Sequence, residues 1–194
     1  MKRSKKAALV LMVPATTFLL AGCGEEPEQA MVFNDPSECS SRGYSSEEAC
    51  IADYKAAQVL HPQVAPKYLS KAECETDFGS GQCETAPQQT TSGGSVFMPM
   101  MMGYMMGSML SRNQMGGNQN FQQTSSSGRS NIPTQPLYKS RDDRNTFRTA
   151  SNKPVAKGTG LVSLRPSQLK PKAGQLVRRG GFGQQAASRS SFGS

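Results

Sequence analysis

Five cysteines carry the clearest chemistry in this sequence, and their spacing divides them into two groups. Cys23 stands at the end of an apolar stretch, far from any other cysteine. The other four lie in one acidic region, at positions 39, 50, 74 and 83. A thiol can be acylated, form a disulfide or bind a metal, so the compartment and the surroundings of each cysteine decide its role.

The first 22 residues are typical of a secretory signal peptide. A basic start, MKRSKK, is followed by an apolar run over residues 7–21. A membrane-spanning helix would need about 20 apolar residues, and Pro14 interrupts this shorter run. We therefore expect residues 1–22 to be a signal peptide that is removed.

The residues before Cys23, Leu20-Ala21-Gly22, resemble the bacterial lipobox. The resemblance implies a lipoprotein in which Cys23 is the lipidation site, carrying diacylglycerol on sulfur and an acyl chain such as palmitate on its amine. Several acyl chains would hold the protein at a membrane. Gly24 favours the outer membrane by similarity to the sorting rules of enteric bacteria. An ordinary signal peptide that ends near a cysteine is the alternative.

Export gives the remaining cysteines an oxidising compartment, where thiols pair. Cys39, Cys50, Cys74 and Cys83 are even in number and predict two disulfides. The simplest connectivity joins Cys39 to Cys50 and Cys74 to Cys83, and a helical hairpin cross-linked between its halves is the alternative. The spacings lack the close cysteine pairs of structural zinc sites. We expect no metal site and no cofactor.

A repeated pattern marks the acidic region over residues 35–90. Residues 46–54 and 70–78 both read S-x-x-x-C-x-x-D-aromatic. The capping-box pattern S-x-x-E begins at Ser45 and again at Ser70. Two helix starts are therefore predicted, each placing a cysteine and an aromatic residue one turn apart.

The predicted helices are short. The first is expected over about Ser46–Leu60, ended by His61 and Pro62, and the second over about Lys71–Phe78, ended by Gly79. Such helices bury little apolar surface, so the two disulfides would supply much of the stability, roughly 2–4 kcal/mol each.

No set of residues suggests catalysis. His61 is the only histidine, and its place beside a proline is typical of a solvated loop. With the thiols oxidised, it has no nucleophile to activate. We expect no catalytic residue and a protein that is not an enzyme. Five carboxylates are expected to form a solvated acidic face, at Glu47, Glu48, Glu73, Glu75 and Asp77.

The uncharged stretch VFMPMMMGYMMGSML, residues 96–110, predicts a short apolar helix. Gly103 and Gly107 form G-x-x-x-G, which favours packing or self-association through a glycine face. Partial insertion into a membrane is a second interpretation. Copper(I) binding by the thioethers of this stretch, extended by Met115, is a third.

The tail, residues 111–194, carries 14 basic and 2 acidic residues, whereas residues 24–90 carry 12 acidic and 4 basic ones. The tail is rich in Gln, Asn, Ser and Gly and is expected to be disordered. Its RGGFG segment is similar to RNA-binding tails. For an exported chain the expected partners are instead anionic envelope polymers or lipids, and no nucleic acid.

The composition as a whole favours a mostly disordered, low-complexity chain. Only 36% of the residues are hydrophobic and tryptophan is absent. The expected ordered parts are a small α-helical, disulfide-stapled region and one short Met/Gly-rich apolar helix. The predicted segments are a signal peptide 1–22, a lipid-anchored linker 23–34, the stapled region 35–90, the apolar helix 96–110 and the tail 111–194.

Several short segments together resemble the YgiB-like family of bacterial proteins. They occur in the same order along the chain and read LAGC at 20–23, APKY at 65–68, ECETDFGSGQC at 73–83, FMPMMMGYMMG at 97–107 and RGGFG at 179–183. The family is a domain of unknown function, so the resemblance implies no activity and no catalytic residues. Some members are encoded near an ATP-grasp enzyme, which implies a shared pathway.

These observations predict an exported cell-envelope lipoprotein with a binding or scaffolding role at the membrane. A periplasmic copper binder that uses the Met cluster is one alternative. An accessory subunit of an envelope enzyme is another.

Overall fold

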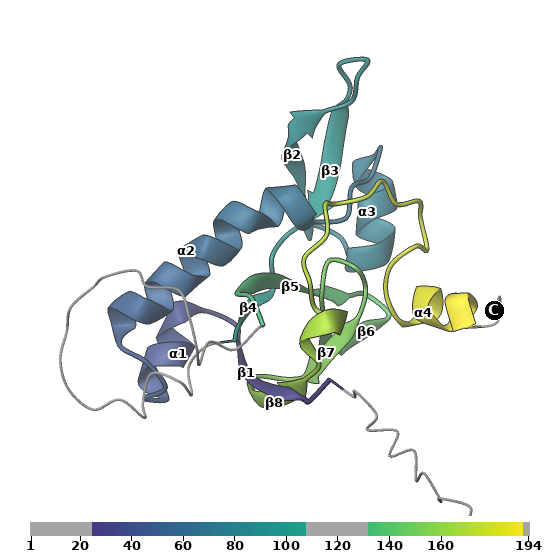
Figure 1. Ribbon diagram of the computed structural model, residues 1–194. Coiled ribbons are helices and arrows are strands. Elements are labelled where there is room, and N and C mark those ends of the chain that lie inside the picture. The colour runs from purple at the N-terminus through teal and green to yellow at the C-terminus, as the bar shows by residue number, and fades with distance from the viewer. Residues whose placement is uncertain (1–24, 108–131, 192–194) are drawn as a thin grey trace, which may run out of the picture.

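The computed structural model describes residues 25–107 and 132–191, and its central element is one antiparallel sheet (Figure 1). Six strands pair in the order β7-β6-β5-β4-β1-β8. The sheet therefore joins strands from both ends of the described chain. The strands are β1 Glu28–Phe33, β4 Gly103–Met106, β5 Gln135–Ser140, β6 Asp143–Arg148, β7 Pro154–Lys157 and β8 Gly160–Leu164.

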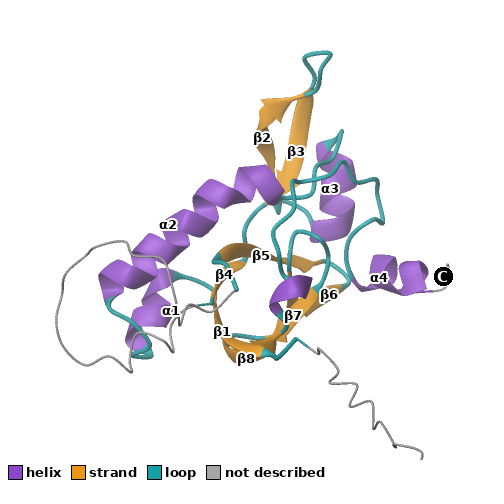
Figure 2. Cartoon of the chain, viewed as in Figure 1, coloured by secondary structure: helices purple, strands orange, loops and turns teal. Residues whose placement is uncertain are grey.

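The two edge strands of this sheet are consecutive in the sequence, which makes the sheet curve. Only Gly158 and Thr159 separate β7 from β8, although these strands stand at opposite ends of the sheet. Gly158 and Gly160 have φ angles of 102° and 124°, which glycine adopts without a steric cost. The edges contact each other, so the six strands form a near-closed barrel (Figure 2).

Both faces of strand β1 are buried over residues 30–33. Successive side chains of a strand point to opposite faces. Ala30 and Val32 pack with residues of β4, β5 and β6, among them Met105, Leu137 and Phe147. The alternate residues, Met31 and Phe33, pack with Tyr104, Met106 and the Cys39–Cys50 pair. That second face is covered by α1, Pro36–Ser41, and α2, Glu47–Val64.

A two-stranded hairpin projects from the body of the molecule (Figure 1). It consists of β2, Cys83–Gln89, and β3, Ser95–Pro99, and it contacts α3, Lys71–Phe78. A third core cluster lies beneath it, with Tyr68, Phe78, Tyr138 and Phe182 as its aromatic members. The remaining elements are the 3₁₀ turn Pro166–Gln168 and α4, Gln184–Ser191.

The starts of α2 and α3 follow from their serine caps. Ser46 accepts a hydrogen bond from the backbone N–H of Ala49, and Ser70 accepts one from Glu73. Helix α3 spans the predicted residues and ends at Gly79. The prediction that Pro62 ends α2 is wrong. A proline in the last turn is tolerated there, and the helix runs to Val64, where the extended Ala65 precedes Pro66.

The prediction of a mostly disordered chain is wrong. Residues 132–191, expected to belong to a disordered tail, contain four strands of the barrel and α4. Residues 28–33, expected to be part of a linker, form β1, which lies between β4 and β8. Composition misled because each strand contributes only a few apolar side chains, and these become a core only when distant strands pair.

The predicted apolar helix over residues 96–110 is also wrong for the part of it that the structure describes, residues 96–107. Residues 95–99 form β3 and residues 103–106 form β4, in two different sheets. Four consecutive residues of β4 are buried because both faces of this strand are covered. A strand buried on both faces shows no alternation, so its sequence cannot be told from a buried helix by periodicity. Within the described ranges, no helix has the length and apolarity to cross a membrane.

Candidate functional site

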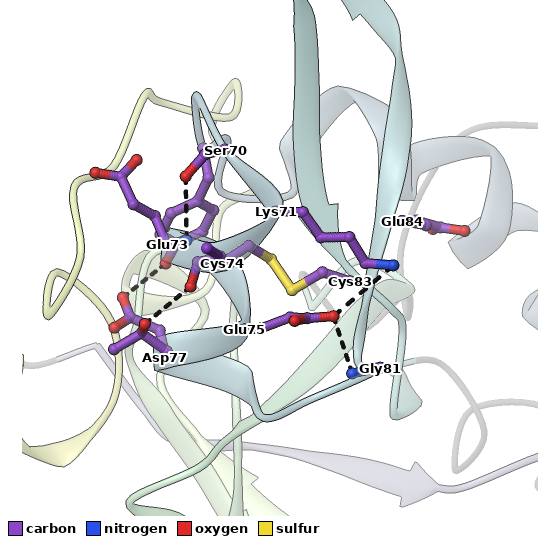
Figure 3. Close-up of a disulfide and its surroundings, with 12 residues drawn as sticks. Ser70, Lys71, Glu73, Cys74, Glu75, Asp77, Gly81, Cys83 and Glu84 are labelled. Carbon is purple, nitrogen blue, oxygen red and sulfur yellow. Dashed lines mark hydrogen bonds and ion pairs between the residues drawn. A yellow bond between two sulfur atoms is a disulfide. The ribbon is translucent and has the colours of Figure 1, made fainter.

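A constrained loop joins α3 to β2 (Figure 3). The Cys74–Cys83 disulfide links α3, one turn before the loop, to the first residue of β2. Gly79 and Gly81 have φ angles of 107° and 72°, which turn the chain sharply. The carboxylate of Glu75 accepts a hydrogen bond of 3.0 Å from the backbone N–H of Gly81. The disulfide and this hydrogen bond hold the loop in one conformation.

The loop is one wall of a cavity of about 350 Å³. We call it the α3–β5 cavity. Its other walls come from the segment after β3 and from the β5–β6 hairpin. The lining residues are Phe78, Gly79, Ser80, Gln82, Met100, Met102, Lys139, Ser140 and Arg144.

Positive charge and apolar surface meet in the α3–β5 cavity. Lys139 and Arg144 line it and no carboxylate does. Neither cation forms an ion pair with any residue that the structure describes. The Lys139 ammonium lies 4.0 Å from the centre of the Phe147 ring, a cation–π contact that positions it. Met100 and Met102 are 40% and 37% exposed and supply apolar surface.

Sequence reasoning missed Lys139 and Arg144 because they lie in the segment expected to be disordered. A local signal was present. The stretch LYKSRDDRNTF has a polar centre between two apolar flanks, which is typical of a hairpin. Ser140 pairs with Asp143, so Arg141 and Asp142 form the turn. The cavity itself could not be predicted, because its walls come from three separate parts of the chain.

A C-terminal segment, residues 174–183, crosses the ends of α2 and α3, and we call it the strap. The backbone N–H of Gly174 donates to the carbonyl of Gln63 over 2.8 Å. Val177 donates in the same way to Lys67 over 2.6 Å. Phe182 inserts its ring 4.7 Å from that of Phe78. The strap therefore completes the third core cluster.

Asp77 is the side chain that binds the part of the strap around Gly180 and Phe182. Its side chain accepts hydrogen bonds from Gly180 N–H at 2.7 Å, from Phe182 N–H at 3.2 Å and from the Tyr68 hydroxyl at 2.9 Å. Burial, together with the neighbouring charge of Asp77, raises the pKa of Tyr68. Asp77 is buried, so placing it on a solvated acidic face was wrong. The RGGFG segment, residues 179–183, is thus the part of the strap that binds Asp77.

The lone histidine is also buried, contrary to the predicted solvated loop. His61 is 7% exposed and lies in the last turns of α2. Its Nδ1 lies 2.8 Å from the Tyr138 hydroxyl, and its Nε2 lies 3.0 Å from Oε1 of Glu84. Since a carboxylate only accepts, Nε2 donates to Glu84 and Nδ1 accepts from Tyr138. Burial lowers the pKa of His61.

This His61 network links α2, β5 and β2. Both ring nitrogens are engaged, and Tyr138 is fully buried. An imidazole held in this way joins three elements, and a substrate would have to displace a core side chain to reach it.

The methionines of the stretch are divided among several parts of the molecule, although Met101 packs against the cluster that contains Met106. Met98, Met105 and Met106 belong to three different core clusters. Met100 and Met102 face the α3–β5 cavity instead. Met109 and Met115 lie outside the described residues. Among the described residues, no group of three or more His, Cys, Asp or Glu could hold a metal ion.

The structure pairs the four cysteines locally, Cys39 with Cys50 and Cys74 with Cys83, which is the simplest of the predicted connectivities. The first disulfide links α1 to α2 and the second links α3 to β2. Cys23 and the expected signal peptide 1–22 lie outside the described residues.

Gly103 and Gly107 do not form a helical G-x-x-x-G face. Gly103 begins β4, and a Cβ there would lie 2.6 Å from the carbonyl oxygen of Phe33. Gly107 is packed against the backbone of Ile132. Both glycines allow close approach of backbone within the folded body, and their effect on self-association remains an expectation from the sequence.

Comparison with known proteins identifies relatives but no activity. Residues 27–193 match the family described as "Protein of unknown function (DUF1190)". A UPF0441 protein of Sodalis glossinidius is 31% identical over 196 residues, which cover 98% of this chain and 86% of the relative. A UPF0441 protein of Erwinia tasmaniensis is 31% identical over 200 residues, covering 94% of this chain and 82% of the relative. No solved structure matches.

Proposed function

The chain belongs to the DUF1190 family of proteins of unknown function, the YgiB-like family, and we propose that it is a binding protein for an anionic, partly apolar ligand. The observation that carries this proposal is the charge of the α3–β5 cavity. Lys139 and Arg144 face it without a carboxylate among its lining residues. An anionic group of a ligand would supply the missing counter-charge.

The apolar part of the ligand is inferred from the other walls. Phe78, Met100 and Met102 line the cavity beside the two cations. Methionine side chains adapt to ligands of variable shape. A phosphate or carboxylate that bears an acyl or alkyl chain fits both requirements, whereas a free inorganic anion would use only the cations.

Two features favour binding over catalysis. The loop that forms one wall is constrained by the Cys74–Cys83 disulfide and by the hydrogen bond from Gly81 to Glu75, which suits a pre-formed binding site. The residue best suited to proton transfer, His61, is enclosed by Tyr138 and Glu84. The copper-binding alternative has less support, since Met98, Met105 and Met106 lie in three different core clusters.

The two disulfides indicate a location outside the cytoplasm. We propose further that Cys23 carries a lipid and anchors the protein in the cell envelope, as its lipobox-like surroundings suggest. The intact mass of protein extracted from envelopes tests the anchor. Cleavage before Cys23 with added acyl mass is the expected result, and an uncut chain without acyl mass would overturn it.

Ligand binding is tested by calorimetric titration of the full chain with a short-chain phosphatidate below its micelle concentration. We expect saturable binding to the wild-type protein and weaker binding to Arg144→Gln and to Met102→Gln. Inorganic phosphate should bind more weakly than the phosphatidate, because it makes no apolar contact.

Arg165→Gln is the matched control, since Arg165 is exposed, carries the same charge and does not line the cavity. Its affinity for the phosphatidate should equal that of the wild-type protein. Equal affinity of the wild-type protein and Arg144→Gln, or an equal loss in Arg165→Gln, would show that the cavity does not bind the anion.

A further inference from the structure

A second cavity, of about 290 Å³, lies beside the α3–β5 cavity. We call it the strap cavity, since Arg179 and Gly180 of the strap line it together with Thr76 and Arg141. The two cavities share a wall. Asp77 and Phe78 are neighbours in α3 but face different cavities, and so do Ser140 and Arg141 of the hairpin.

A hydrogen bond marks this shared wall. The backbone N–H of Arg141 donates to the carbonyl of Asp77 over 2.7 Å. The two cavities therefore adjoin at the surface where the end of α3 meets the β5–β6 turn. We call it the basic face, after the cations Lys139, Arg141, Arg144 and Arg179 that line the two cavities.

The carboxylates near the basic face are engaged by groups of the protein. Asp77 accepts three hydrogen bonds, as described above. Asp142 accepts from the Gln185 N–H at 2.9 Å and from the Ser140 hydroxyl at 2.5 Å. Asp143 pairs with Arg148 at 3.2 Å. Four cations thus outnumber the two carboxylates that line the cavities, and the face keeps a net positive charge.

Exposed apolar side chains lie among these cations. Met100 and Met102 open to solvent next to Lys139 and Arg144. Cations attract the phosphates of anionic lipids, and apolar side chains between them can enter the interfacial region of a bilayer. A polyanionic glycan would satisfy the cations but would leave the two methionines exposed. The combination fits a lipid surface better.

We infer that the basic face docks on a membrane that carries anionic lipids, and that the ligand of the α3–β5 cavity is drawn from that bilayer. This inference rests on the proposed function. Arg141 and Arg179 contact lipid headgroups beside the cavity, while Lys139 and Arg144 hold the anionic group of the bound lipid within it.

Vesicle flotation of the full chain tests the inference. The Cys23→Ser background removes the proposed acyl acceptor, and every variant keeps the same N-terminal segment, whose own affinity for lipid cancels in the comparison. Binding to vesicles of phosphatidylcholine with phosphatidylglycerol should exceed binding to phosphatidylcholine alone. Arg141→Gln with Arg179→Gln should weaken binding to the anionic vesicles by about fivefold for each arginine.

Two further variants make the test specific. Arg165→Gln with Lys170→Gln removes the same charge from exposed positions outside both cavities and should weaken vesicle binding much less. Met100→Gln with Met102→Gln keeps the charge and should also weaken vesicle binding. If the methionine variant binds the anionic vesicles as well as the parent protein, adsorption is purely electrostatic and the inference is overturned. Equal losses of vesicle binding in the two charge variants would overturn it as well.

Failure of this inference is distinguishable from failure of the proposed function. Arg141→Gln with Arg179→Gln should leave the titration with short-chain phosphatidate nearly unchanged, because that ligand occupies the other cavity. If phosphatidate binds as proposed but the anionic vesicles bind no better than neutral ones, the cavity keeps its function and membrane docking is wrong.

Discussion

The carboxylate of Asp77 and the backbone N–H of Gly180 form a hydrogen bond of 2.7 Å between residues 103 positions apart. This contact closes the strap over α3 and encloses Phe182 in the core. It also gives the two halves of the repeated sequence pattern a common role. Asp53, the equivalent of Asp77, accepts a hydrogen bond from the Thr134 hydroxyl, just before β5. In both copies an aspartate ties its helix to a distant segment.

Asp77→Asn should destabilise the fold by about 2–4 kcal/mol, because the amide nitrogen cannot accept the hydrogen bonds that one carboxylate oxygen accepts. Urea unfolding followed by circular dichroism measures the loss. Glu48→Gln, at an exposed position of α2, is the control and should change stability little. A midpoint equal to that of the wild-type protein would mean that the strap is not held by Asp77.

Removal of the Cys74–Cys83 disulfide should affect both stability and ligand binding. Changing both cysteines to serine opens a link between residues 9 positions apart and should cost about 3 kcal/mol of unfolding free energy. The same variant should also weaken phosphatidate binding, since the freed loop forms a wall of the cavity.

The Cys39–Cys50 disulfide is the matched comparison. It closes a link of similar length, 11 positions, near the start of α2, and neither cysteine lines the α3–β5 cavity. Changing this pair to serine should lower stability by a similar amount while leaving the affinity for phosphatidate unchanged. Equal losses of affinity in both variants would argue that the loop has no particular role.

Gly103→Ala should destabilise the protein by about 1–3 kcal/mol. The added Cβ would lie 2.6 Å from the Phe33 carbonyl oxygen and 2.8 Å from the Phe147 ring, both in the core. Gly94→Ala, whose Cβ would meet only the Thr90 side chain, should cost less. Thermal unfolding compares the two. A stable Gly103→Ala protein with altered oligomeric state would instead support a glycine interaction face.

The stability of the protein should fall as the pH drops below 6.5. Burial lowers the pKa of His61 in the folded state below its unfolded value of 6.5. Between these two pKa values the unfolded chain binds more protons, so stability rises with pH and is fully present above 6.5. Glu84, which favours the charged imidazole, opposes the shift only in part.

The measurement is the urea midpoint at a series of pH values between about 5 and 7.5, a range that lies above the pKa of ordinary carboxylates. His61→Gln should lower stability but remove most of the slope in this window. Below it, Asp35, Glu38, Asp142 and Asp143 have lowered pKa values, so acid should destabilise both proteins. A slope that persists in His61→Gln would assign the titration to another group.

Local features of this protein could be predicted from the sequence. The S-x-x-E pattern at Ser70 and the glycine at position 79 predicted α3 with its observed bounds. The serine cap of α2 was placed one residue too early, at Ser45 in place of Ser46. Cysteines close in sequence paired as the simplest connectivity suggested. Each of these depends on residues within one or two helical turns of each other.

The barrel and its cavities were decided by contacts between distant residues. Met31 faces Met106 across one pair of strands and Leu161 across another, and nothing local to Met31 specifies either partner. The same holds for Gly180, which reads as part of a flexible RGG segment until Asp77 binds its N–H. The sequence by itself determined the helix caps, the charge and the paired cysteines. The tertiary structure alone decided which side chains are buried and which cations meet at one cavity, because burial depends on strands that pair across the length of the chain.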